Sequence, residues 1–228
     1  MANRPTFRTW LGCVLALAAW PGMAWATELR VSVSGDGAPL ADAVVSLHPV
    51  GARSAAASAR ADMNQRDSMF VPGVLPVQVG TLVRFPNSDN IQHHVYSFSE
   101  AKRFDLPLYA GRDAPPVLFD VTGVVVVGCN IHDWMIGHIV VVDTPYFART
   151  GADGMVRLQA PPGDYDLRVW HVRADRRVAD RRLSLRGASI PAQQVELSVT
   201  PAPAAVEARG SERLRELQQK FRRMKDGT

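Results

Sequence analysis

The chain has 228 residues, of which 46% are hydrophobic and 21% are charged, and its formal net charge is +4. This length allows one large domain or two small ones, and the hydrophobic fraction is large enough to bury a core. The small net charge gives no ground for expecting a nucleic acid partner.

Residues 1–26 have the pattern of a secretory signal peptide. Arg4 and Arg8 precede an apolar run over residues 10–25, and the segment ends in a small residue, Ala26. We expect cleavage after Ala26 and export to the periplasm, which lowers the net charge from +4 to +2. A retained anchor is the alternative, but the run is short for a membrane span. The mature chain is therefore expected to have neither a membrane span nor a nucleic acid partner.

Short β-branched segments with period two follow, separated by Gly, Pro, Asn and Asp, which is typical of an all-β sandwich. The composition of residues 51–61 indicates a loop or linker. Strands are expected at residues 29–33, 43–47, 74–79, 81–85, 94–98, 118–121, 124–127 and 139–142.

The last third of the chain continues this pattern and then changes. Further strands are expected at residues 155–158, 165–170, 182–185 and 194–199. Pro201 and Pro203 end the sheet pattern, and residues 207–224 indicate one polar helix. Residues 207–226 hold seven Lys or Arg against four acids, so this tail is either a basic surface helix or a docking segment.

Cys129 is the only cysteine left after export, because Cys13 lies in the signal peptide. An intramolecular disulfide is then excluded, which leaves burial, a partner disulfide, a nucleophile or a metal thiolate. His132 and Met135 follow Cys129 at intervals of three. Thiolate, imidazole and thioether suit copper, and so short a loop can direct all three at one point.

A fourth ligand has to come from elsewhere in the chain, and His93 or His94 can supply it. Only one of two successive strand residues can face the site. Two imidazoles and one thiolate with a weak axial methionine form the blue-copper arrangement, which carries electrons.

These residues carry a family resemblance. The segment 81–87, the pair His93-His94 and the motif Cys129-x-x-His132-x-x-Met135 resemble the cupredoxins of the amicyanin and plastocyanin type, over residues 62–143. The resemblance implies that copper is bound by His93, Cys129 and His132 in the plane, with Met135 axial. His94 stands where the family usually has asparagine, so it is the alternative to His93.

Two further resemblances concern the rest of the chain. As a whole, it is similar to periplasmic proteins described as methylamine utilization proteins, although no residue identifies methylamine. Residues 33–47 and 150–170 resemble the two halves of a transthyretin-like, carboxypeptidase-regulatory-like sandwich. Residues 27–50 therefore open either this companion sandwich or the cupredoxin sheet.

The predicted fold is all-β, with a cupredoxin-like Greek-key β-sandwich, a transthyretin/carboxypeptidase-regulatory-like β-sandwich and a C-terminal helix. The predicted division is a signal peptide, first strands, a copper domain, a companion sandwich and a helical tail, at residues 1–26, 27–50, 51–144, 145–200 and 201–228.

The predicted function is a periplasmic blue copper protein that holds one mononuclear copper ion and carries single electrons. Its partner is expected to be a periplasmic dehydrogenase or cytochrome. Trp134 and Ile136 are expected to cover the copper edge. An enzyme is not expected, because no group orients a Cys-His nucleophile and a multicopper oxidase needs more Cys-His clusters. A copper storage or delivery protein, or a structural sandwich without metal, is the alternative.

Overall fold

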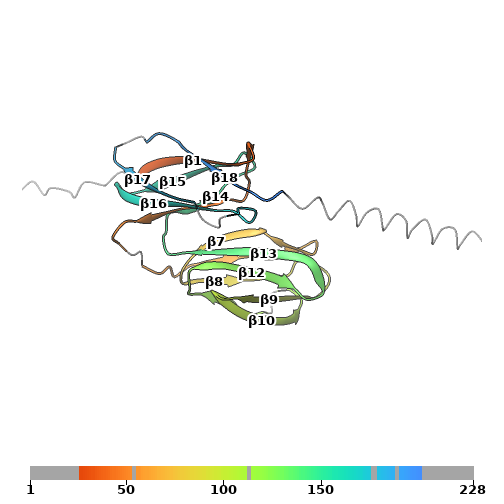
Figure 1. Ribbon diagram of the computed structural model, residues 1–228. Helices are drawn as coiled ribbons and strands as arrows, with labels where there is room; N and C mark the ends of the chain where they lie inside the picture. The colour runs from red at the N-terminus through yellow and green to blue at the C-terminus, as the bar shows by residue number, and fades with distance from the viewer. Residues whose placement is uncertain (1–25, 53–54, 112–113, 176–178, 188–189, 202–228) are drawn as a thin grey trace, which may run out of the picture.

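The computed structural model describes residues 26–52, 55–111, 114–175, 179–187 and 190–201, and every regular element in these ranges is a β-strand. The all-β prediction is thereby confirmed for this part of the chain. Figure 1 shows two β-sandwiches stacked on each other. The expected signal peptide, except for its last residue, and the expected C-terminal helix lie outside the described residues. Within them, no helix is long and apolar enough to span a membrane.

The companion sandwich consists of two four-stranded sheets. One has the strand order β15-β1-β18 with β2 paired to β1, and the other has the order β14-β3-β16-β17. The bounds are β1 Thr27–Gly35, β2 Ala38–Pro39, β3 Val44–Pro49, β14 Phe147–Arg149, β15 Met155–Ala160, β16 Gly163–Trp170, β17 Ala179–Leu185 and β18 Gln193–Leu197.

Alternating side chains build the core of the companion sandwich. Leu29, Val31 and Val33 of β1 are at most 1% exposed, and they pack in one cluster with Leu47 of β3 and Leu167 of β16. Successive strand residues point to opposite faces, so a period-two sequence turns one face inward. Burial of each side chain of this size, relative to leaving it exposed, stabilises the folded state by about 1.5–3 kcal/mol.

The second sandwich holds a five-stranded sheet of order β10-β9-β12-β13-β7, a three-stranded sheet of order β11-β8-β4 and the hairpin β5-β6. The bounds are β4 Arg60–Asp62, β5 Asn64–Arg66, β6 Met69–Val71, β7 Val74–Gln78, β8 Thr81–Arg84, β9 His93–Ser99, β10 Lys102–Tyr109, β11 Val117–Phe119, β12 Gly123–Cys129 and β13 His132–Val142. Its core contains Phe85 and Phe119, which both pack on the ring of Phe104.

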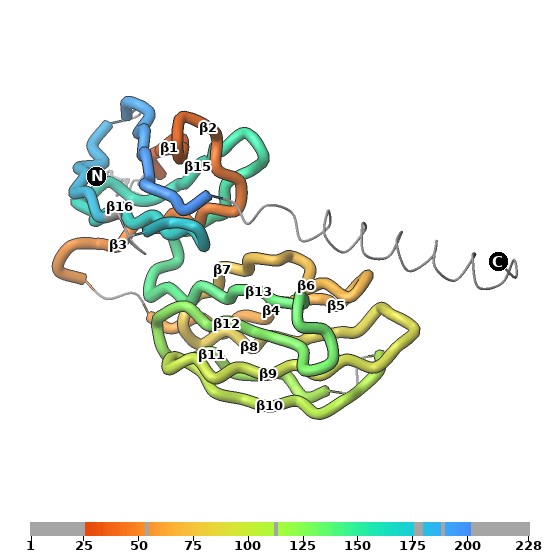
Figure 2. The backbone as a smooth tube through the Cα atoms, turned by 45° about the vertical axis from the view of Figure 1, so that its right-hand side comes forward, coloured from red at the N-terminus to blue at the C-terminus, as the bar shows by residue number. Residues whose placement is uncertain are grey.

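The chain leaves the companion sandwich after β3 and returns to it at β14 (Figure 2). The exit and the return are adjacent, because the Thr144 hydroxyl donates to the Leu47 carbonyl at 2.6 Å and the Leu47 amide donates to the Tyr146 carbonyl at 2.8 Å. By strand pairing, β1 and β3 lie in the companion sandwich. The sequence had left this placement open.

The fully apolar segment 139–142 of β13 packs into the core of the second sandwich on one face and into the junction between the sandwiches on the other. Ile139 and Val141 point into the core of the second sandwich, whereas Val140 and Val142 join a cluster at the junction. Residues of β3, β7 and β16 complete this cluster: Val44, Val74 and Trp170. Both faces of segment 139–142 are therefore buried, which explains the absence of polar residues from it.

Candidate metal centre

Three side chains from three strands converge at one end of the second sandwich. His93 begins β9, Cys129 ends β12 and His132 begins β13, and one ligand atom from each lies within 4.8 Å of the others. The Cys129 Sγ lies 3.8 Å from His93 Nδ1 and 3.7 Å from His132 Nδ1. His93 is 0% exposed and Cys129 is 3% exposed, so solvent reaches this cluster mainly at His132.

A change of register in the β12–β13 hairpin places Cys129 opposite His132. Gly128 pairs with Ile136, but the next residue, Cys129, already pairs with His132. The register thus slips by three residues, and such an irregularity in pairing redirects the side chains beside it. A Cβ atom on Gly128 would lie 3.2 Å from the Tyr96 ring, so glycine at this position leaves room for that ring.

Of the two adjacent histidines, the structure places His93 next to Cys129. His94 points to the other face of β9, where its Nε2 lies 2.6 Å from Asp105 Oδ1 and its ring lies 5.4 Å from the Tyr96 ring. This arrangement follows from strand alternation. The alternative in which His94 meets Cys129 is not the one that the geometry shows.

The buried side chain of Asn87 fixes the loop before His93. Its Nδ2 donates to the carbonyl oxygens of Ile91 at 2.8 Å and Tyr109 at 3.1 Å, and its Oδ1 accepts from the Asp89 amide at 2.9 Å. A short polar side chain that bonds its own neighbouring backbone is well suited to such a turn. Asn87 thereby connects the loop to the end of β10.

Asp89, which was not among the residues predicted from the sequence, contacts the far side of the His93 ring. Its Oδ2 lies 2.8 Å from His93 Nε2, and its carboxylate accepts the amides of Asp67 at 2.7 Å and Ser68 at 3.0 Å. Burial favours the neutral acid, but the amide hydrogen bonds and the His93 ring outweigh it and hold the pKa of Asp89 below 3.8. The carboxylate is therefore ionised near neutral pH.

A polar network lies among the buried residues behind the cluster. The Tyr109 hydroxyl donates to the Phe85 carbonyl at 2.5 Å and accepts from Gln65 Nε2 at 2.6 Å. Burial raises the pKa of Tyr109 to about 12, so the phenol stays neutral. This network pins β10 against the loop that follows β8.

Met135 and its neighbours alternate between the interior and the surface. Met135 is 0% exposed and belongs to the same core cluster as Cys129. Trp134 and Ile136 are 60% and 50% exposed, and the Trp134 ring lies 5.2 Å from the His132 ring. The exposed Trp134 ring thus borders the partly exposed His132.

The donor set and its spacing fit a bound metal ion. With the bond lengths of protein zinc sites, about 2.3 Å to sulfur and 2.0–2.1 Å to nitrogen, and a trigonal angle of about 120°, the two ligand atoms lie about 3.8 Å apart. The observed separations between the Cys129 sulfur and the two imidazole nitrogens are 3.8 and 3.7 Å. Two imidazoles and one thiolate at trigonal spacing are a donor set that suits copper.

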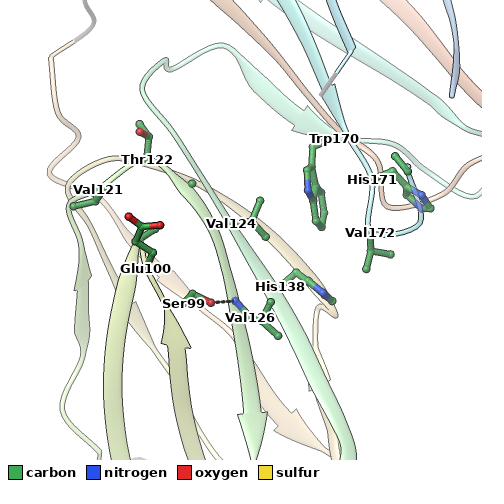
Figure 3. A pocket seen from close by; sticks show the side chains of 13 residues that line it. Ser99, Glu100, Val121, Thr122, Val124, Val126, His138, Trp170, His171 and Val172 are labelled. Atoms are coloured by element: carbon green, nitrogen blue, oxygen red, sulfur yellow. Dashed lines mark hydrogen bonds between the residues drawn. The ribbon is translucent and has the colours of Figure 1, made fainter. Parts of the chain in front are cut away.

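The remaining described histidines have other surroundings. His48 lies between Ser46 Oγ at 2.9 Å and Asp143 Oδ1 at 2.6 Å. His138 and His171 line a cleft of about 620 Å³ beside the junction of the sandwiches (Figure 3). Other side chains of this cleft are Ser99, Glu100, Thr122, Val124, Trp170 and Val172. The cleft includes none of the three converging residues, so it is separate from the metal centre.

Comparison with solved structures finds copper proteins. A purple cupredoxin from Nitrosopumilus maritimus is 24% identical, with a TM-score of 0.32, over 37% of this chain and 99% of that one. A copper-containing nitrite reductase from Thermus scotoductus SA-01 is 25% identical, with a TM-score of 0.36, over 42% of this chain. Only 26% of the reductase is covered. A reduced amicyanin variant is 20% identical, with a TM-score of 0.34, over 44% of this chain and 99% of the variant.

No protein-family profile and no curated protein matches the sequence. Because the TM-scores to solved structures are low, the metal assignment depends on the geometry of the two histidines and the cysteine.

Proposed function

We propose that the protein is a periplasmic blue copper protein that carries single electrons between redox partners. The observation that carries this proposal is the convergence of His93 Nδ1 and His132 Nδ1 on the Cys129 sulfur at 3.8 and 3.7 Å. Met135 would supply a weaker fourth contact through its thioether sulfur. Its burial in the same core cluster as Cys129 supports that role.

Each residue has a distinct part in this function. Bound copper supplies a one-electron change of oxidation state, and no substrate bond is made or broken. Cys129 would bind copper as the thiolate. Asp89 holds the His93 ring in place on the side away from Cys129. His132 reaches the surface beside Trp134, so we assign it the path by which electrons enter and leave. Ligands on paired strands keep their positions, which suits a centre that should rearrange little.

The proposal places the copper site in residues 51–144, as a domain between the strands of the companion sandwich. In the same proposal, the protein is exported, the mature chain has no membrane span, and the copper site catalyses no reaction. The proposed partner is a periplasmic dehydrogenase or cytochrome, in keeping with the resemblance to methylamine utilization proteins. Surface access at His132 supports exchange with a protein partner.

Absorption and paramagnetic-resonance spectra of the copper-loaded full chain test this function. We expect an intense blue colour from the thiolate–Cu(II) pair, and we expect Cys129→Ala to abolish it. His93→Ala should also abolish it, whereas the matched variant His94→Ala should keep it, because His94 pairs with Asp105 on the other face.

Two results contradict an electron carrier. Copper that binds only as a colourless reduced ion and leaves rapidly to chelators indicates storage or delivery. A wild-type protein that takes up no copper indicates a structural sandwich.

A further inference from the structure

We propose that Asp89 is a positioning residue of the metal centre, which fixes the tautomer of His93 and favours Cu(II) over Cu(I). This inference rests on the proposed copper function and adds a residue outside the four proposed ligands. Its basis is the 2.8 Å contact between Asp89 Oδ2 and His93 Nε2, on the side of the ring away from Cys129.

The first step concerns the proton on the imidazole. An ionised carboxylate only accepts hydrogen bonds, so His93 Nε2 must donate and must carry the hydrogen. In the neutral ring, Nδ1 then keeps its lone pair, and this is the atom that faces the Cys129 sulfur. Asp89 therefore holds His93 in the tautomer that can bind a metal at Nδ1.

The second step concerns the position of the carboxylate. The amides of Asp67 and Ser68 hold its two oxygens, and the Asp89 amide is held in turn by Asn87. The Asp89 side chain is 14% exposed and the His93 side chain is 0% exposed. These hydrogen bonds hold the Asp89 carboxylate at a constant distance from the His93 ring. Because both side chains have little contact with water, the negative charge of Asp89 is weakly screened.

The third step concerns oxidation state. In the proposed function, bound copper would supply the one-electron change between Cu(II) and Cu(I), and the electron would come from a protein redox partner. A negative charge one imidazole away, which also raises the basicity of Nδ1, stabilises the more highly charged ion more strongly. Asp89 should therefore lower the reduction potential of the centre.

The variant Asp89→Asn removes this charge with little change of shape. Loss of such a partner typically weakens metal binding 10–100-fold. We expect the affinity for Cu(II), relative to that for Cu(I), to fall about tenfold. A tenfold change in this ratio raises a one-electron potential by about 59 mV.

The chain offers a matched control in Asp105→Asn. Asp105 also pairs with a histidine, His94, at 2.6 Å, but that ring points away from Cys129 and the carboxylate is 71% exposed. Both variants change the net charge by the same amount. Only Asp89→Asn should shift the potential and the Cu(II)/Cu(I) affinity ratio.

The experiment uses the full chain, with copper titrations in both oxidation states, voltammetry, and nitrogen NMR of the imidazoles in the metal-free protein. Two results together support the inference: His93 carries its hydrogen on Nε2, and the Cu(II)/Cu(I) affinity ratio changes about tenfold in Asp89→Asn but not in Asp105→Asn. If Asp89→Asn does not fold, Asp89→Ser, which also removes the charge, is measured in its place. In that case a rise of about 59 mV supports the role of the charge, and a change of less than about 20 mV overturns it.

Failure of this inference differs from failure of the proposed function. A blue wild type whose ratio changes less than twofold in Asp89→Asn, or equally in Asp105→Asn, overturns the inference alone. A His93 ring that carries its hydrogen on Nδ1 in the metal-free protein also overturns it, whether or not copper binds. A wild type that never turns blue overturns the proposed function.

Discussion

Replacement of Asn87 by alanine should loosen the loop that carries Asp89 and leads into His93. The change removes three hydrogen bonds of 2.8, 3.1 and 2.9 Å, two of them to carbonyl oxygens and one from an amide. At about 0.5–1.5 kcal/mol each, the expected loss of unfolding free energy is about 2–4 kcal/mol. For a protein of this size, that loss lowers the Tm by roughly 4–16 °C.

Thermal unfolding of the metal-free protein, followed by circular dichroism, measures this loss without any contribution from bound metal. Ser88→Ala is the control, since it removes one exposed hydrogen bond of 3.0 Å to Asn64 in the same loop. Its cost should stay within about 0.5 kcal/mol. If Asn87→Ala unfolds at the same temperature as Ser88→Ala, these side-chain hydrogen bonds do not hold the loop.

Two further measurements probe the described structure. Tyr109→Phe should cost about 1–3 kcal/mol in urea unfolding, because the buried Phe85 carbonyl loses its hydroxyl donor and Gln65 loses an acceptor. An unchanged midpoint would show that this network adds no stability. Burial lowers the pKa of His138 and His171 below 6.5 in the folded state. The unfolded chain then binds more protons, so stability should fall as the pH drops below about 6.5. The double variant His138→Gln/His171→Gln should flatten this dependence, and an unaltered slope contradicts the assignment.

The part of the metal centre that is local in sequence could be predicted from sequence. Cys129, His132 and Met135 lie on one hairpin, and their intervals of three already limit how far apart they can be. For the second histidine, the sequence left a choice between His93 and His94. Strand alternation allows only one of the two rings to face Cys129, but it does not indicate which one. The packing of β9 against β12 resolves that choice.

Asp89 could not be predicted, because its role depends on a turn more than twenty positions earlier in the chain. The amides of Asp67 and Ser68 reach it only after β5 and β6 have formed their hairpin. No periodic pattern marks such a contact.

Strand β10 was also missed. Its sequence alternates charged and apolar residues weakly and contains Pro107, which is tolerated because β10 lies at the edge of its sheet. The placement of residues 27–50 was undecided because the two strands that flank β1, β15 and β18, lie more than 120 residues away in the sequence; Leu29, for example, pairs with Leu158.

The double crossing between the sandwiches limits how the metal centre can move. A carrier joined by a single flexible linker can rotate freely until it meets a partner. Here the chain crosses twice between the sandwiches. The hydrogen bond from Thr144 to Leu47 joins the two crossings, and the valines and Trp170 of the junction pack between the sandwiches, so free rotation is not possible. In the proposed function, a redox partner that bound the companion sandwich would therefore approach the histidine–cysteine cluster from one fixed direction, and its binding position would set the distance over which the electron passes.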